Sequence, residues 1–270
     1  MVTILVAWVA WDSRAPSSIY LASDSRISWG TMTTFDYGRK VFGCSSSPEL
    51  FGYCGDVLFP SIILSQLTEL IDLNLIFIGN ETAEEKFKII YDFIKDSFEK
   101  YPKKKGWSRA EIVYCTRNTS NDFFIWKMIF YLGDNSLSSE FIQIDVNDTP
   151  IAVGSGAKEF KQKFTDYNDK KSDIAKTSRA VFQCLFHTLS DINDPYCGGA
   201  PQLVGLYRIG NARKYGIIKD GERFFMGKQL FNVATNLDHI EWRNDSFEVC
   251  DGLTTCIKSG SQRQPNPHLR

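Results

Sequence analysis

Three residues near the start of the chain have types and positions that suit nucleophilic catalysis. Thr3 opens an apolar run, Asp24 follows a second apolar run, and Lys40 opens a third. A buried carboxylate at a strand end is costly unless it is paired, so Lys40 is the expected partner of Asp24. A threonine hydroxyl is a weak nucleophile, but a free α-amine on the same residue, with an ordinary pKa of about 7.7–8.0, can take its proton. The three side chains therefore indicate a threonine nucleophile that is activated by an N-terminal amine.

The sequence around these residues resembles a known family. Three motifs carry the resemblance, in this order: Thr3-x-x-Val-Ala7, Ala22-Ser-Asp-Ser-Arg26 and Lys40-Val41. They resemble the opening of proteasome β-type subunits and of their bacterial relatives, the HslV type and especially the Anbu type, all of which are N-terminal-nucleophile hydrolases. The resemblance implies that Thr3 is the nucleophile, that Lys40 lowers the pKa of its amine and hydroxyl, and that Asp24 holds the lysine in place.

Three further motifs match the family in the same order: Gly52-Tyr-Cys-Gly-Asp56, Ile151-Ala-Val-Gly-Ser-Gly156 and Asp194-Pro-Tyr-Cys-Gly-Gly199. The first resembles the turn whose backbone N–H forms the oxyanion hole, which implies that role for Gly52; such a contact is worth roughly 3–4 kcal/mol of barrier. The other two resemble turns that carry supporting residues, here Ser155 and Asp194. Cys197 stands where the family has a serine, and its thiol is the weaker hydrogen-bonding group.

Met1 and Val2 precede the expected nucleophile. Removal of the initiator methionine alone leaves Val2-Thr3, with no free amine on the threonine. We therefore expect the Val2–Thr3 bond to be cleaved, either by autocatalytic processing or by another peptidase. The alternative is that Thr3 is an ordinary strand residue.

The apolar patterning predicts an α+β protein. Alternation and turn residues predict strands at 3–9, 18–23, 39–43, 50–53, 111–115, 123–132, 141–145, 151–157 and 201–209. Helical spacing predicts helices at 62–75, 82–101, 158–167 and 172–190. This order suits helices that cover two faces of antiparallel sheet. The family resemblance implies a four-layer αββα sandwich of two antiparallel sheets.

Length and composition favour one globular domain. The chain has 270 residues, of which 43% are hydrophobic and 14% aromatic, and its sequence shows neither an internal repeat nor a compositional shift that would mark a linker. We expect the domain to span residues 1–258, with 210–258 as a family-specific C-terminal extension. Residues 259–270 form a polar tail that we expect to be mobile.

Net charge limits the expected partners, and cysteine content indicates the expected compartment. A net charge of −1 gives no reason to expect binding to nucleic acid or to an anionic membrane surface. No apolar run is long enough to span a bilayer. Seven cysteines without paired spacing or a Cys/His cluster favour free thiols in a reducing compartment. We therefore expect a cytoplasmic protein that needs no metal and no cofactor.

The function that these observations favour is a threonine-type peptidase or amidase, which acts on peptide or protein substrates through an acyl-enzyme on Thr3. Because proteasome-like relatives work as rings or open helical assemblies, the resemblance also implies self-association. One alternative is a catalytically silent family member that keeps Met1 and Val2 and serves assembly or binding; the presence of Asp24 and Lys40 speaks against it. Another is an amidase for small molecules, as in the penicillin-acylase-like branch, which the motifs resemble less.

Overall fold

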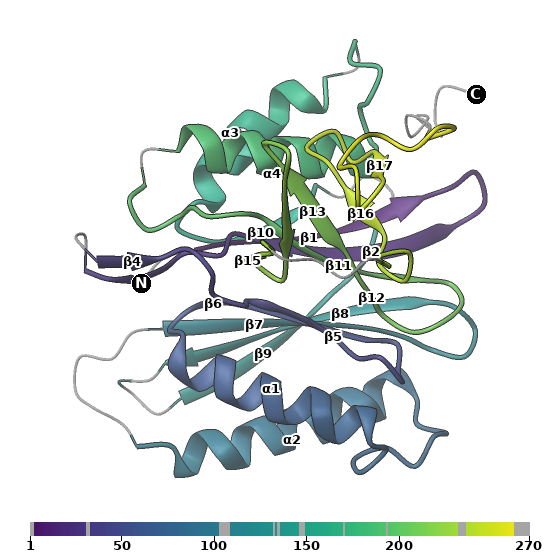
Figure 1. The fold of residues 1–270 in the computed structure, drawn as a ribbon. Helices are drawn as coiled ribbons and strands as arrows, with labels where there is room; N and C mark the ends of the chain where they lie inside the picture. The colour runs from purple at the N-terminus through teal and green to yellow at the C-terminus, as the bar shows by residue number, and fades with distance from the viewer. Residues whose placement is uncertain are drawn as a thin grey trace.

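The computed structural model describes residues 3–30, 33–102, 109–131, 133, 136–145, 149–169, 171–192, 194–231 and 236–261. Met1, Val2 and residues 262–270 of the tail predicted at 259–270 lie outside these ranges. Within them, two five-stranded antiparallel sheets pack face to face, and a pair of helices covers the outer side of each (Figure 1). This layering agrees with the predicted α+β class.

The first sheet holds the N-terminal hairpin at its centre. Its strand order is β10-β1-β2-β11-β12, and all neighbouring strands are antiparallel. Its strands are β1 (Ile4–Trp11), β2 (Pro16–Ser23), β10 (Ile151–Gly154), β11 (Gln202–Tyr207) and β12 (Arg213–Lys214). The strands predicted at 3–9 and 18–23 are confirmed as β1 and β2, which pair as a hairpin.

The second sheet follows the chain order, β5-β6-β7-β8-β9, and is also antiparallel. Its strands are β5 (Val41–Gly43), β6 (Glu49–Gly55), β7 (Arg109–Arg117), β8 (Phe123–Tyr131) and β9 (Ser136–Ile142). The strand predicted at 141–145 lies earlier in the chain, because β9 pairs with β8 from Ser136 onward.

Two helices cover each sheet. α1 (Leu58–Asp72) and α2 (Ala83–Lys100) pack on the second sheet, and α3 (Ala157–Tyr167) and α4 (Ser178–Asp191) pack on the first. The described residues include no helix long and apolar enough to cross a membrane.

Capping residues explain where the helices begin. The Thr82 side chain accepts the N–H of Glu85, and the Glu85 carboxylate accepts the N–H of Thr82, so a capping box starts α2 where the sequence predicts it. The Thr177 hydroxyl accepts the N–H of Ala180 in the same way. This cap starts α4 at Ser178, later than the predicted start at residue 172.

The strand β1 is buried on both faces. Ile4, Val6 and Trp8 pack under α3 and α4, whereas Leu5 and Ala7 pack between the two sheets. A strand that is covered on both faces reads as a continuous apolar run, which is the pattern of this segment. The position of the residue before β1 is therefore fixed by packing from both sides.

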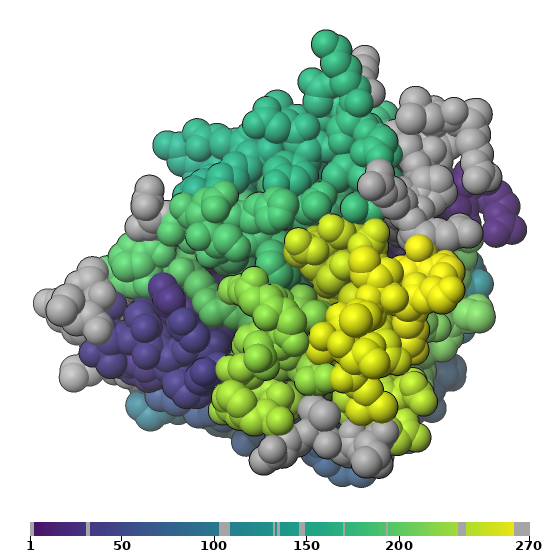
Figure 2. Space-filling model, turned by 45° about the horizontal axis from the view of Figure 1, so that its top comes forward, coloured from purple at the N-terminus to yellow at the C-terminus, as the bar shows by residue number. Residues whose placement is uncertain are grey.

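The chain after residue 210 forms a further sheet. Its order is β15-β14-β13-β16-β17, and the β13–β16 pair is parallel. Its strands are β13 (Gly216–Lys219), β14 (Glu222–Phe225), β15 (Lys228–Gln229), β16 (Trp242–Arg243) and β17 (Val249–Cys250). A small hairpin of β3 (Ile27–Trp29) and β4 (Thr33–Phe35) follows β2. In Figure 2 the segment after residue 210, lime to yellow, covers much of one face and borders the purple N-terminal segment.

Candidate active site

The first sheet brings Thr3 and Asp24 together. Thr3 directly precedes β1 and Asp24 directly follows β2, and these antiparallel neighbours pair Leu5 with Ser23 at this end. The Asp24 N–H donates to the carbonyl of Ile4 at 3.3 Å. Adjacent ends of a hairpin thus place the hydroxyl beside the carboxylate, and the Thr3 hydroxyl donates a hydrogen bond to Asp24 Oδ1.

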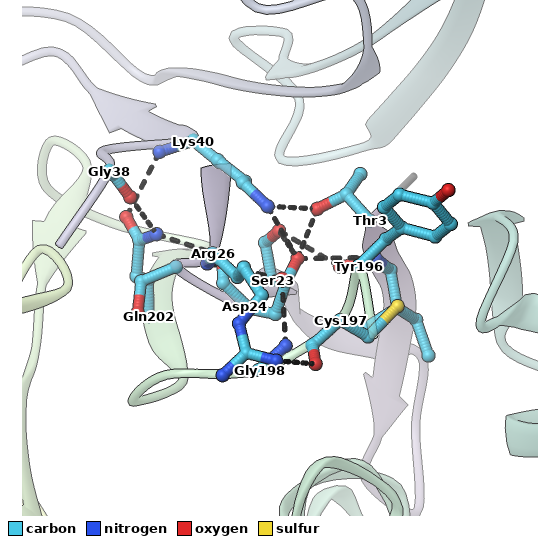
Figure 3. Close-up of polar contacts among 12 residues, drawn as sticks. Thr3, Ser23, Asp24, Arg26, Gly38, Lys40, Tyr196, Cys197, Gly198 and Gln202 are labelled. Atoms are coloured by element: carbon cyan, nitrogen blue, oxygen red, sulfur yellow. Dashed lines mark hydrogen bonds and ion pairs between the residues drawn. The ribbon is translucent and has the colours of Figure 1, made fainter. Parts of the chain in front are cut away.

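Lys40 reaches the same point from the second sheet. It directly precedes β5, and its Nζ lies 2.8 Å from Asp24 Oδ1 and also donates to Thr3 Oγ1 (Figure 3). Both charged side chains are almost fully buried, 1% exposed for Lys40 and 0% for Asp24. The structure therefore brings together the three residues that the sequence singled out.

The carboxylate of Asp24 is surrounded by hydrogen-bond donors. Oδ1 also accepts the N–H of Ile4, and Oδ2 accepts the N–H groups of Arg26 and Gly198, each at 3.2 Å. A buried charge is tolerated when it is paired and hydrogen-bonded. Asp24 can therefore remain in the interior opposite Lys40.

Ser155, Asp194 and Cys197 form a second cluster next to this one. The Ser155 hydroxyl donates to Asp194 Oδ2, and the Cys197 Sγ lies 3.8 Å from Ser155 Oγ and 3.7 Å from Asp194 Oδ2. Burial and the nearby carboxylates raise the pKa of the Cys197 thiol to about 12. The thiol is therefore protonated at neutral pH and acts as a weak hydrogen-bonding group rather than as a nucleophile.

The two clusters are joined by backbone contacts. Gly154, which precedes Ser155, lies opposite Ile4 in the β1–β10 pair. An ideal Cβ at Gly154 would lie 2.0 Å from the carbonyl oxygen of Thr3. Only glycine permits this approach, so the turn that carries Ser155 packs directly on the residue proposed as nucleophile.

The backbone N–H that points to the side of Lys40 belongs to Gly55, whereas the sequence resemblance implies Gly52 for the oxyanion hole. The Tyr53 N–H bonds to the Lys40 carbonyl at 3.0 Å, so odd-numbered residues of β6 direct their backbone groups toward β5. By this alternation Gly52 directs its N–H toward β7, and Gly55 directs its N–H to the side of Lys40. Gly55 also lines a cavity that borders Thr3. Gly52 lies in the middle of the strand.

The length of β6 explains this difference. The sequence predicts a turn from Gly52 onward, but pairing with β7 continues as far as Gly55. Gly55 has a φ of +90°, and an ideal Cβ there would lie 2.2 Å from the carbonyl oxygen of Arg109. The turn that leads into α1 therefore requires glycine at position 55.

Two residues near the site were not assigned a role from the sequence. Arg26 donates through Nε and Nη2 to the two carboxylate oxygens of Asp36, at 2.7 and 2.9 Å, and through Nη1 to the carbonyls of Pro195 and Cys197. Gln202 is fully buried beside Asp24. Arg26 lies in one of the recognised motifs, whereas the pattern around Gln202 contains no signal that could have singled it out.

No family model matches this chain, and no curated protein matches it. Among the described residues, no group of three His, Cys, Asp or Glu side chains is arranged to hold a metal ion.

Proposed function

We propose that this chain is a threonine-type peptidase or amidase with the four-layer N-terminal-nucleophile hydrolase fold, related to the proteasome-like family. The observation that supports this most is the position of Thr3 Oγ1, which accepts a hydrogen bond from Lys40 and donates one to Asp24. A hydroxyl between a buried ammonium and a buried carboxylate is oriented, and an alkoxide that develops there is stabilised by the adjacent positive charge.

The proposed reaction requires a free amine on Thr3. Thr3 Oγ1 attacks the carbonyl carbon of the amide, and its proton passes to the amine, directly or through one water. Lys40 stabilises the developing negative charge on Oγ1, and the Gly55 N–H donates to the carbonyl oxygen as it becomes an oxyanion. The C–N bond then breaks, and the amine returns the proton to the leaving nitrogen. Water hydrolyses the resulting ester and regenerates Thr3.

One observation favours the alternative of a catalytically silent protein. Thr3 is only 2% exposed, so a substrate carbonyl cannot reach its hydroxyl without local opening or cleavage before it. A chain that retains Met1 and Val2 would leave this hydroxyl without an amine base. The state of the N-terminus therefore separates the two functions.

The first test uses a chain whose first residue is Thr3, produced by cleaving a removable fusion partner directly before it. We expect this chain to hydrolyse fluorogenic peptide amides, and we expect Thr3→Ala to abolish the activity. Lys40→Met should lower kcat by about 10²–10³-fold, because the positive charge beside the nucleophile is lost. Lys88→Met, on the exposed side of α2, is the matched control and should leave kcat unchanged.

The outcomes distinguish the two proposals. Equal hydrolysis by the Thr3→Ala variant would show that Thr3 is not the nucleophile. Absence of hydrolysis from the chain that begins at Thr3, together with an intact mass showing that the natural product keeps Met1 or Val2, would favour the silent protein.

A further inference from the structure

Gln202 connects the backbones that carry the two charged residues of the site. It is the first residue of β11, lies opposite Ser23 of β2, and is 0% exposed. Its Nε2 donates to the carbonyl of Asp24 at 3.0 Å and to that of Gly38 at 2.7 Å. Its Oε1 accepts the N–H of Lys40 at 3.1 Å (Figure 3).

Only a primary amide fits this environment. Two carbonyl oxygens face one side of the Gln202 side chain and one N–H faces the other, which matches the two donors and the acceptor of an amide and fixes its orientation. A carboxylate of the same length would face two carbonyl oxygens, and an apolar side chain would leave all three buried groups unpaired.

The position of this amide matters because Asp24 and Lys40 belong to different sheets. Asp24 follows β2 in the first sheet, and Lys40 precedes β5 in the second. The lysine side chain is a flexible four-carbon chain, so the place of its ammonium depends on where its backbone is held. We infer that Gln202 is a positioning residue, which fixes the Lys40 backbone against that of Asp24 and so aims the ammonium at Thr3 Oγ1.

One turn of the C-terminal segment lies against Gln202. Gly227, in the turn between β14 and β15, has a φ of +81°, and an ideal Cβ there would lie 2.7 Å from Ser25 Cβ, 3.1 Å from Gly38 O and 3.3 Å from Gln202 Cδ. The side chain of Met226 is buried between the two main sheets. The segment 210–258 borders the N-terminal segment in Figure 2. Its turn at Gly227 packs against Gly38, in the loop to which Gln202 is hydrogen-bonded.

The positioning role can be measured without any activity. Amide hydrogen exchange at Lys40 should become about tenfold faster in Gln202→Met, because the acceptor of its N–H is lost. The same increase is expected in Gln202→Glu, because the new carboxylate faces the carbonyl oxygens of Asp24 and Gly38 and is displaced by them. Gln183→Met, on α4, is the control and should leave the Lys40 amide unchanged. Unchanged exchange at Lys40 in both Gln202 variants would overturn the inference.

A second pair of variants tests the turn at Gly227 and does not alter Gln202. Gly227→Ala should also accelerate exchange at Lys40, because its Cβ would displace the loop. Gly221→Ala is the matched control, since Gly221 also has a positive φ, +77°, but nothing lies within 4 Å of an added Cβ. Equal exchange at Lys40 in the two alanine variants would remove the turn from the proposal.

The effect on hydrolysis rests on the proposed function. In the chain that begins at Thr3, we expect Gln202→Met to lower kcat by about tenfold or more with KM almost unchanged, and to shift the pH profile of kcat, because the ammonium no longer faces the nucleophile. A wild-type chain without hydrolysis but with faster Lys40 exchange in the Gln202 variants would refute the proposed function and retain the positioning role. Active Gln202 variants with unaltered kcat and unaltered exchange would refute the positioning role alone.

Discussion

Thr3 Oγ1 lies between an ammonium and a carboxylate that are both shielded from water. The Lys40 and Asp24 side chains are 1% and 0% exposed, so both have lost their hydration. Their mutual attraction, together with the backbone N–H groups that donate to Asp24, compensates for this loss. Replacing such a pair with apolar residues often costs little, which makes it poor evidence for stability alone. Both side chains of the pair are hydrogen-bonded to the Thr3 hydroxyl, which indicates a chemical role for the pair.

At the scale of this pair, Lys40→Met should be strongly destabilising. Loss of the ammonium leaves the buried Asp24 carboxylate without its partner, which typically costs about 3–5 kcal/mol of the free energy of unfolding. The double variant Lys40→Met with Asp24→Leu should cost less than the sum of the two single changes. Urea unfolding curves of the three variants measure this. Additive losses would indicate that the two charges do not interact.

At the scale of elements, the site depends on loops that are tied to strand ends. Arg26, after β2, and Asp36, after β4, form a two-point ion pair, and the Gly38 N–H bonds to the Ser25 carbonyl at 2.8 Å. The hydrogen bonds from Arg26 hold the pKa of the Asp36 carboxyl below its usual range. The loop that leads to Lys40 is therefore fixed partly by charge.

This ion pair predicts a pH dependence. Because the pKa of Asp36 is lower in the folded state, the unfolded chain binds more protons near pH 4, and stability falls as the pH falls through the folded pKa. The ion pair contributes fully above the unfolded pKa of about 3.9. Asp36→Asn should therefore reduce the free energy of unfolding more at pH 6 than at pH 2.5. A difference that is equal at both pH values, measured by urea unfolding, would contradict this.

Elements set by local sequence were predictable, and those set by distant contacts were not. The β1–β2 hairpin and α2 follow from apolar spacing and from the Thr82 cap, which are both local. The turn at Gly55 depends on how far β6 pairs with β7, and the position of Gln202 depends on β2 lying beside β11. Spacing within one segment contains no information on these pairings.

At the scale of the whole molecule, the site is assembled between the two main sheets, and the C-terminal sheet borders it. The sequence motifs predicted that Thr3, Asp24 and Lys40 act together, and the structure brings their side chains into contact. The sheet after residue 210 could not be predicted, because it is built from strands of two to four residues and includes a parallel pair. Its turn at Gly227 packs against residues of the site, so this segment belongs to the same domain.

The most direct measurement of the central claim is covalent labelling of the chain that begins at Thr3 with an electrophile that requires both a threonine hydroxyl and its α-amine, such as a peptide epoxyketone. Peptide mapping by mass spectrometry should place one adduct on Thr3, formed much more slowly in Lys40→Met and absent in Thr3→Ala. A folded chain with a free Thr3 amine that forms no adduct, or that is modified equally in Thr3→Ala, would contradict the assignment of Thr3 as the nucleophile.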